Sequence, residues 1–188
     1  MKKRCKYLKL TNPNYVKYHD EEWGRPIHDE HDLYELFTLE LFQAGLSWEC
    51  ILNKRENFRR AYDNFDINKI CNYDEKKVNE LMNDKSIIRN KLKIEASIST
   101  SKIIKDKIIP KYGSFNNYIW HFTKGKSKWI DVKVTSNKLS DEVSKDMKKL
   151  GMKFVGTVTI YSFLQACGVI NSHDKDCFVY EELEKNKI

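Results

Sequence analysis

The chain has 188 residues, of which 40% are hydrophobic and 12% aromatic, enough to bury a substantial core. Its 7 Gly and 3 Pro are too few for a turn-rich β-sandwich, and no apolar run is long enough to span a membrane. The net charge of +7 suits a polyanionic partner such as nucleic acid, although a Lys-rich composition alone would also produce it. The basic start of the chain has no apolar segment after it, so we expect no signal peptide, a cytoplasmic location and reduced cysteines.

Apolar spacing and capping residues predict an almost entirely helical chain. Residues 1–28 are expected to be irregular. Helices are predicted at 32–44, 48–65, 75–84, 87–109, 115–122, 140–150 and 157–167, with a short strand or extended loop at 128–135. Asp66, Asp74, Ser114 and Ser140 are expected at helix N-termini, and Pro110 is expected to end the fourth helix.

Two Cys-His pairs stand at opposite ends of the chain. His173 and Cys177 are four residues apart, and Cys5 and His19 lie near the N-terminus. Together they form a Cys2His2 set, which is typical of a structural zinc site because four protein ligands leave no open position. For the C-terminal pair alone, a surface histidine and a buried cysteine remain the alternative.

Glu40 falls on or beside the apolar stripe of the helix predicted at 32–44. A buried carboxylate needs a partner, so this position suggests a pocket that accepts hydrogen bonds or positive charge, unless it lies at the rim and reaches water. Tyr15, Tyr18, Trp23 and Trp48 lie in flanking segments and suit a flat cationic ligand, although such clusters are more often core.

The stretch "NDKSIIRNKLKIEA" at 83–96 leads from a turn into a basic helix. Turn amides and a helix N-terminus can hold phosphate, so the segment is a candidate DNA-binding hairpin. The candidate contacts are Ser86, Ile87, Arg89, Asn90, Lys91 and Lys93. An ordinary solvated basic helix is the alternative.

Several motifs, in this order, resemble the bacterial 3-methyladenine DNA glycosylase I family. They are "RCKY" at 4–7, "NYVKYHDEEWG" at 14–24, "LFQAGLSWECILNKRENFRRAYDNFD" at 41–66, "SIIRNKLKIEA" at 86–96 and "MKKLGMKFVGTVTIYSFLQACGVINSHDKDC" at 147–177. The similarity extends from Arg4 to Cys177, nearly the whole chain.

The resemblance implies an all-α, helix-hairpin-helix DNA glycosylase fold in one domain with two lobes, residues 1–30 plus 140–188 and about 31–139. It implies one structural Zn²⁺ held by Cys5, His19, His173 and Cys177. It also implies that Glu40 recognises the excised base in an aromatic pocket that includes Tyr7, Tyr15, Tyr18, Trp23 and Trp48. Leu46 is our candidate for the wedge that fills the gap left by a flipped base.

We therefore expect a monomeric, monofunctional enzyme of base excision repair that removes 3-methyladenine from alkylated double-stranded DNA. The alternatives are a non-catalytic zinc-stabilised DNA-binding protein, a zinc hydrolase, and a glycosylase for another lesion. The chain departs from the family at Tyr7, where Trp is frequent, and at Ser86, where Gly is common. Leu41 and Phe42 are bulkier than usual and are expected to reshape the back wall of the pocket.

Overall fold

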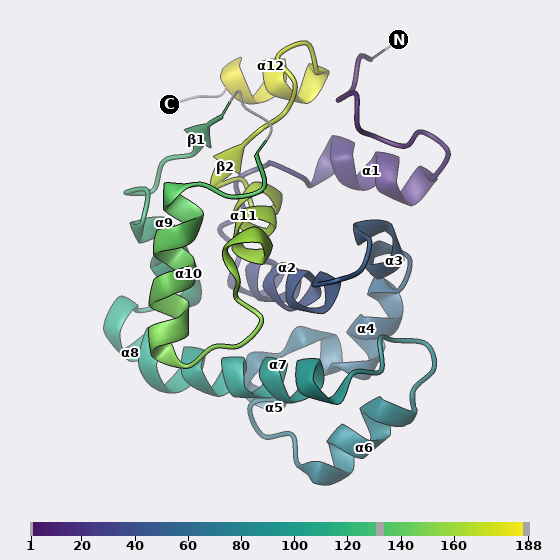
Figure 1. The fold of residues 1–188 in the computed structure, drawn as a ribbon, viewed down its shortest axis with the longest axis vertical. Coiled ribbons are helices and arrows are strands. Elements are labelled where there is room, and N and C mark those ends of the chain that lie inside the picture. The colour runs from purple at the N-terminus through teal and green to yellow at the C-terminus, as the bar shows by residue number, and fades with distance from the viewer. Residues whose placement is uncertain (1, 131–133, 186–188) are drawn as a thin grey trace.

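The computed structural model describes residues 2–130 and 134–185, and in these ranges the chain is mostly helical (Figure 1). The first elements are α1 (Pro13–Glu21), α2 (Glu30–Gln43), α3 (Trp48–Leu52), α4 (Arg55–Ala61), the 3₁₀ helix η1 (Asp63–Phe65), α5 (Ile67–Ile70), α6 (Glu75–Asn83) and α7 (Lys91–Ile103). The later elements are the π-helical η2 (Ile104–Ile108), α8 (Ile109–Tyr112), α9 (Phe115–His121), β1 (Lys128–Trp129), α10 (Lys138–Leu150), α11 (Thr157–Ala166), β2 (Ile170–Asn171) and α12 (Phe178–Lys185). The predicted predominance of helix is confirmed, and no helix of the described part is long and apolar enough to cross a membrane.

Helix α2 lies at the centre of the molecule, with α7, α9 and α11 packed around it (Figure 1). Asp29 caps its start by accepting a hydrogen bond from the N–H of Asp32. Every residue from Leu33 to Phe42 is buried, so α2 is covered on all sides rather than on one stripe. Polar side chains on this helix cannot reach water, and each needs a protein partner or a ligand.

One hydrophobic core joins α2 to α7, α9, α10 and α11. The ring of Phe37 stands edge-on to those of Phe115 and Phe163, with centroids 5.4 and 5.1 Å away. A second, small cluster of Cys5, Cys177 and Val179 forms where the two ends of the chain meet. Core residues occur on both sides of position 140, and the division into two lobes stays a prediction.

The N-terminal segment is fastened to the end of α11. The N–H of Ile27 donates to the carbonyl of Cys167 at 3.1 Å. At Gly168 an added Cβ would lie 2.4 Å from the carbonyl carbon of Arg25, so only glycine permits this approach. The close contact brings residues 13–24 beside α11, where the site is built.

The prediction that residues 1–28 are irregular is wrong, because α1 occupies part of this range. Asn12 is its N-cap and accepts from the N–H groups of Asn14 and Tyr15, and Pro13 opens the helix. Both residues are signals for a helix start, and the sequence analysis did not use them.

Two predicted helices have different bounds. The stretch 48–65 is three short helices, because the chain bends at Lys54 and Asn64 adopts a positive φ of 54°. The helix expected at 87–109 begins at Lys91, since the preceding residues form a turn. It also passes Pro110 and ends at Gly113, because the π-helical η2 has already rearranged the hydrogen-bond ladder before the proline.

The last third of the chain contains two further differences. The N-cap of α10 is Asn137 rather than Ser140, which lies three residues into the helix and completes a capping box. Helix α12 was not predicted. β1 pairs in parallel with β2, which accounts for the start of the stretch expected to be extended, while residues 131–133 lie outside the described residues. The predicted N-caps Asp66, Asp74 and Ser114 are confirmed.

Candidate active site and metal centre

A pocket of about 820 Å³ opens between α1, the end of α2, the start of α3 and α11. All six side chains that the sequence proposed for a base pocket line it: Tyr7, Tyr15, Tyr18, Trp23, Glu40 and Trp48. They come from four separate segments, and the folding of α1 against α2 and α3 brings them together. The structure thus places the predicted set in one cavity.

Glu40 is the unusual group of this pocket. Its side chain is 4% exposed, and its Oε2 has no hydrogen-bond partner among the residues that the structure describes. Burial away from water raises the pKa of Glu40 to about 8. The alternative of a helix-rim carboxylate in water is therefore excluded, and the group is placed to receive a ligand.

Aromatic side chains enclose the Glu40 carboxyl. The rings of Tyr18 and Trp48 lie 5.2 Å apart at an angle of 44°. The Tyr18 hydroxyl and the Trp48 Nε1 are also buried without a hydrogen-bond partner in the described part of the chain. Buried polar atoms are normally paired, so three unpaired groups facing one cavity indicate a polar, flat ligand that would pair with them.

One side of the pocket, formed by α11 and by the segment before the C-terminal Cys-His pair, was not predicted. The missed lining residues include Gln43, Tyr161, Ser162, Gln165 and Ser172. The Tyr161 hydroxyl is a fourth buried polar atom without a described partner, and Gln165 donates to the Ser172 hydroxyl at 2.5 Å. The polar residues 161, 162 and 165 interrupt the apolar sequence of α11, and this was the available signal.

The bulky residues expected in the back wall of the pocket lie elsewhere. Leu41 and Phe42 are almost fully buried in the core, and the Phe42 ring packs 4.8 Å from that of Phe58. The expectation that they form the back wall of the pocket is wrong, because neither residue lines it and Phe42 packs against α4.

Cys5, His19, His173 and Cys177 meet in one buried cluster, with their ligand atoms within 4.8 Å of one another. The Cys5 Sγ lies 3.3 Å from the His173 Nδ1, and the Cys177 Sγ lies 3.7 Å from both the His19 Nε2 and the His173 Nδ1. Tetrahedral zinc with sulfur at about 2.3 Å and nitrogen at about 2.0–2.1 Å would separate such ligand atoms by about 3.3–3.8 Å. The four side chains therefore fit a tetrahedral metal ion.

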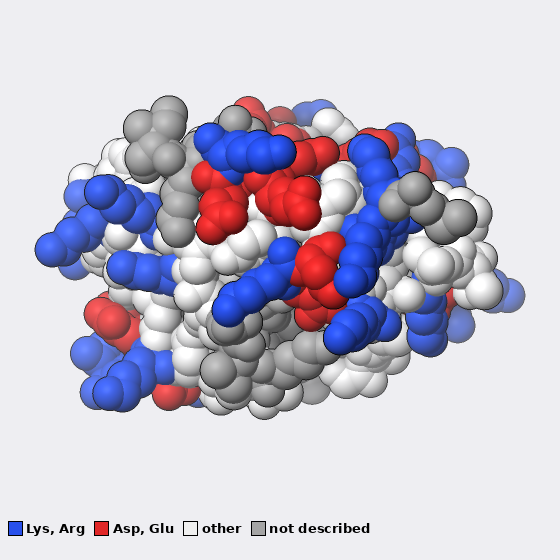
Figure 2. All heavy atoms as spheres, turned by 90° about the horizontal axis from the view of Figure 1, so that it is seen from above, with Lys and Arg blue, Asp and Glu red and all other residues white. Residues whose placement is uncertain are grey.

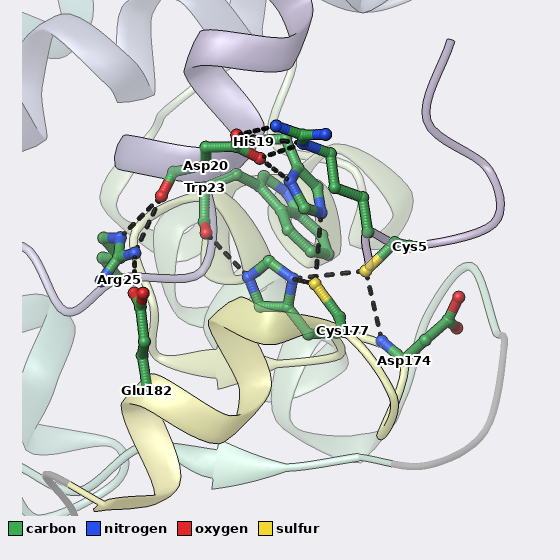
Figure 3. A network of polar contacts seen from close by, with 10 residues as sticks. Cys5, His19, Asp20, Trp23, Arg25, Asp174, Cys177 and Glu182 are labelled. Carbon is green, nitrogen blue, oxygen red and sulfur yellow. Dashed lines mark hydrogen bonds and ion pairs between the residues drawn. The ribbon is translucent and has the colours of Figure 1, made fainter. Parts of the chain in front are cut away.

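The outer nitrogens of both imidazoles have partners (Figure 3). The His19 Nδ1 is 2.9 Å from the Asp20 carboxylate, and the His173 Nε2 is 3.0 Å from the Trp23 carbonyl. Such contacts select the tautomer that turns the other nitrogen toward a metal. A hydrogen bond with Cys5 lowers the pKa of Cys177, so one thiolate is already favoured.

A second layer of charged groups fixes Asp20. Arg4 donates to both of its carboxylate oxygens, at 2.8 Å each for the shortest contacts. Arg25 donates to the Asp20 carbonyl and to Glu182 on α12 (Figure 3). This network connects the first residues, α1 and the last helix around the cluster.

The metal cluster and the pocket share a wall. His19 and His173 are among the pocket-lining residues, and Trp23 packs against the His173 ring at 4.5 Å. Changes at the metal cluster are therefore positioned to alter the shape of the pocket.

The predicted hairpin is a turn between α6 and α7. Asp84 accepts from the backbone N–H and the hydroxyl of Ser86, and Asn90 caps α7. Ser86 does not adopt a positive φ, so its difference from the common glycine causes no strain. Arg89, Asn90 and Lys91 are exposed around this turn, as a phosphate contact requires.

Two of the proposed DNA contacts have side chains that are turned away from the surface. The Ile87 side chain is 3% exposed and belongs to the core. Lys93 is 6% exposed, and its ammonium donates to the backbone carbonyls of Phe42 and Ala44. Its position in the first turn of α7 turns the side chain inward, toward the end of α2.

Leu46 lies in the loop between α2 and α3, beside the pocket, and is 39% exposed. Gly45 before it adopts a φ of 79°, and the side chain of Gln43 donates to the Leu46 carbonyl at 3.1 Å. An exposed apolar side chain in a structured loop is consistent with the predicted wedge.

Positive charge is not concentrated on the end of the molecule that carries both termini. Figure 2 shows this face with a group of acidic residues at its centre and Lys and Arg on both sides. The net charge of +7 therefore does not mark this face as the surface for a polyanion.

Comparison with known proteins gives one consistent family. The model of the methyladenine glycosylase family matches residues 8–180. DNA-3-methyladenine glycosylase 1 of Escherichia coli (strain K12) is 39% identical over 183 residues, which are 94% of this chain and 96% of that protein. DNA-3-methyladenine glycosylase of Haemophilus influenzae is 37% identical, over 87% of this chain and 90% of its own length.

Solved structures agree with the sequence relatives. A crystal structure of 3-methyladenine DNA glycosylase I has a TM-score of 0.88 at 40% identity and covers 94% of this chain and 98% of its own. The Staphylococcus aureus 3-methyladenine DNA glycosylase I, solved for its recognition of 3-methyladenine, has a TM-score of 0.88 at 34% identity, with 93% and 95% coverage. The chain belongs to the methyladenine glycosylase family.

Proposed function

We propose that this protein is a monofunctional DNA glycosylase that removes 3-methyladenine from alkylated double-stranded DNA in base excision repair. The relatives from Escherichia coli and Haemophilus influenzae are named DNA-3-methyladenine glycosylase. One observation carries the proposal for this chain: Glu40 is a buried carboxyl with an unpaired oxygen in a pocket of aromatic side chains. Such a pocket suits a flat base with positive charge.

The substrate supplies much of the driving force. Methylation at N3 makes the base cationic, so the C1′–N9 bond can break with its electron pair leaving on a neutral base. The oxygen of a water then bonds to C1′ and gives its extra proton to solvent, which leaves an abasic site. No strong general acid is required, and the protein must chiefly find, flip and hold the base.

Glu40 would recognise the charge of the base. In the empty pocket its pKa of about 8 keeps it mostly protonated near neutral pH. A nearby cation favours the carboxylate, so the base would lower this pKa and gain an ion pair in a site of low polarity. Unmodified adenine brings no charge and has a stronger glycosidic bond. It would be discriminated against both in binding and in cleavage of the glycosidic bond.

Tyr18 and Trp48 would stack on the flipped base, with Tyr7, Tyr15 and Trp23 flanking it. Their rings supply contact area, and the unpaired Tyr18 hydroxyl and Trp48 N–H supply hydrogen bonds. Leu46 would enter the duplex in place of the base, which offsets part of the few kcal/mol that unstacking costs.

The turn at 84–90 would act as the helix-hairpin-helix contact with the DNA backbone. Its exposed Arg89 and Lys91 suit phosphates, and Ser86 and Asn90 lie in the same turn. This assigns sequence-independent affinity to the hairpin and leaves lesion recognition to the pocket.

The metal would be one zinc ion bound by Cys5, His19, His173 and Cys177. Four protein ligands leave no position for an activated water, so the role is structural, fastening the two ends of the chain. We further propose a monomer that acts in the cytoplasm, where the five free cysteines stay reduced.

The competing functions explain less of the geometry. A non-catalytic DNA-binding protein has no use for a buried, unpaired Glu40. A zinc hydrolase needs an open coordination position, which the four-residue cluster does not offer. A glycosylase for another lesion shares the fold, and the charge preference of Glu40 favours a cationic base over a neutral one.

The direct test uses duplex DNA treated with a methylating agent. Incubation with the protein should release 3-methyladenine, seen by chromatography of the soluble fraction. The DNA should then break only after added alkali, as expected of a monofunctional enzyme that uses no lysine nucleophile to form a Schiff base. Release of no base by folded protein that binds DNA would support the non-catalytic alternative, and breakage without alkali would refute a monofunctional enzyme.

A further inference from the structure

Lys93 is a lysine buried in an unusual place. It belongs to the first turn of α7 and is only 6% exposed. Its Nζ donates to the carbonyl oxygen of Phe42 at 2.8 Å and to that of Ala44 at 2.5 Å. Within the described residues, no carboxylate forms an ion pair with it, and burial lowers its pKa. A buried cation of this kind is costly, and two carbonyl contacts are its compensation.

The two carbonyls belong to the C-terminal end of α2. Carbonyl groups in the last turn of a helix have no partner within the helix, and this end carries partial negative charge. Ala44 is the C-cap of α2. Lys93, from another helix, supplies both hydrogen-bond donors for the free carbonyls and positive charge at this end. The end of α2 is thus held by α7.

The chain that follows this end carries two parts of the proposed machinery. Leu46, the candidate wedge, comes two residues after Ala44. Ser47 then caps α3, whose first residue is Trp48 of the pocket. The direction in which α2 ends therefore decides where both side chains lie.

On its other side, Lys93 is connected to the hairpin. Its own N–H donates to the side chain of Asn90, the cap of α7. A second contact joins the turn to the start of α4. The side chains of Lys54 and Asn57 donate to the carbonyl of Ser86 at 2.9 and 3.2 Å. The DNA-binding turn is thus joined to the end of α2 through Lys93 and to the start of α4 through Lys54 and Asn57.

We propose that Lys93 is a positioning residue that couples the DNA-binding turn to the loop of residues 44–48 and so sets Leu46 and Trp48 for base flipping and excision. This proposal rests on the proposed glycosylase function. It replaces the prediction of a phosphate contact at position 93, and the two assignments have different consequences.

The test compares four variants with the full-length, metal-loaded protein. Lys93→Met keeps most of the length of the side chain and removes the cation. Lys93→Arg keeps the charge and the donors. Lys91→Met removes an exposed charge two residues away, at the proposed phosphate surface. Lys102→Met, also exposed on α7, serves as the neutral control.

Two quantities are measured for each variant: the single-turnover rate of 3-methyladenine release at saturating protein, and the salt dependence of binding to undamaged duplex. Lys93→Met should lower the rate at least about tenfold, since small misplacements of reacting groups cost that much or more. Its salt slope should equal that of the unchanged protein, and Lys93→Arg should restore most of the rate. Lys91→Met should reduce the salt slope by about 1, and Lys102→Met should leave both the slope and the saturated rate unchanged.

Either of two results would overturn the proposal. One is an unchanged rate in folded Lys93→Met, and the other is a reduced salt slope in that variant, which would return Lys93 to the phosphates. If Lys93→Met does not fold, Lys93→Gln, which keeps one donor, is judged by the same two measurements.

Amide hydrogen exchange separates this proposal from the proposed function. In Lys93→Met, residues 44–48 should exchange at least about tenfold faster than in the unchanged protein, while α10 keeps its protection. If the unchanged protein released no base, the glycosylase function would fail, yet the exchange rates would still decide whether Lys93 holds the loop. Equal exchange at 44–48 would overturn its positioning role.

Discussion

The backbone carbonyl of Trp23 accepts a hydrogen bond from His173 while the Trp23 side chain forms part of the pocket wall. The distance from the His173 Nε2 to this oxygen is 3.0 Å, and the two rings lie 4.5 Å apart. One residue thus orients an imidazole of the candidate metal cluster and lines the pocket that contains Glu40. The candidate metal cluster therefore lies next to the pocket, although the four residues of the cluster come from the two ends of the sequence.

Removing the metal should therefore weaken both stability and base binding. A strong chelator, or Cys177→Ser, should lower the melting temperature by about 10 °C or more, because a structural metal contributes several kcal/mol. Affinity for free 3-methyladenine, measured by calorimetry below the new melting temperature, should fall as well. Cys50→Ser, at a half-buried cysteine outside the cluster, should change neither value. Equal melting temperatures with and without chelator would argue against a structural metal.

Asp20 should set the affinity of the metal cluster through His19. Its carboxylate lies 2.9 Å from the His19 Nδ1, and Asp20→Asn removes the charge that orients the ring. Loss of such a partner lowers metal affinity by about 10–100-fold. Competition with a coloured chelator measures this, and Asp176→Asn, at a surface carboxylate paired with Lys3, is the matched control. Identical affinities in the two variants would contradict the role of Asp20.

Glu40→Gln should stabilise the protein increasingly as pH rises. The pKa of Glu40 is raised from 4.5 to about 8 by burial, so the folded state holds a proton that the unfolded state has lost. The stability that this bound proton contributes is fully present below about pH 4.5 and is lost as pH rises through about 8. Glutamine does not titrate, so the variant should gain on the order of 2–4 kcal/mol over this window.

Denaturant unfolding at pH 5, 6.5 and 8 measures this gain. Glu142→Gln, at an exposed position of α10, should show no such trend. A constant difference between Glu40→Gln and the unchanged protein at all three values would mean that Glu40 keeps its ordinary pKa.

Glu35 should contribute strongly to stability. Its carboxylate is fully buried on α2, where it lies 2.5 Å from the Arg55 Nε and 2.9 Å from the Arg59 Nη2. Arg55 also pairs with Glu22 at 2.6 Å, so the group ties α2, α4 and the end of α1 together. Glu35→Gln leaves arginine charge without its partner and should cost about 3–5 kcal/mol.

Glu56→Gln provides the comparison for Glu35. It removes an exposed carboxylate that also pairs with Arg59, and it should change the free energy of unfolding by less than about 1 kcal/mol. Similar losses in both variants would show that the buried network adds nothing beyond a surface ion pair.

Much of the candidate site could be predicted because it consists of residue types that are unusual at their positions in the sequence. The four candidate metal ligands were evident as Cys and His at the two ends, and Glu40 was evident as an acid on an apolar stripe. The structure brings both sets together. Capping signals likewise located the starts of α5, α6 and α9, since an N-cap is a local interaction.

The features that could not be predicted depend on the direction in which a side chain points rather than on its residue type. Lys93 and Lys91 are the same residue type, and only the packing of α7 against α2 turns Lys93 inward. Tyr161 and Gln165 interrupt the apolar sequence of α11, but their residue types do not show which cavity they line, and only the packing of α11 brings them to the pocket. The continuation of the helix past Pro110 needed the π-helical rearrangement in η2, which no residue of the sequence marks.

The most direct test of the account is the single-turnover release of 3-methyladenine by the unchanged protein and by Glu40→Gln on the same methylated duplex. Glutamine has nearly the same shape but cannot become an anion, so release should fall by about 100-fold or more while binding to undamaged duplex stays within about twofold. This result would place the charge of Glu40 at the excised base. Equal release by folded Glu40→Gln would contradict the central claim, because the buried carboxyl would then have no part in recognising the lesion.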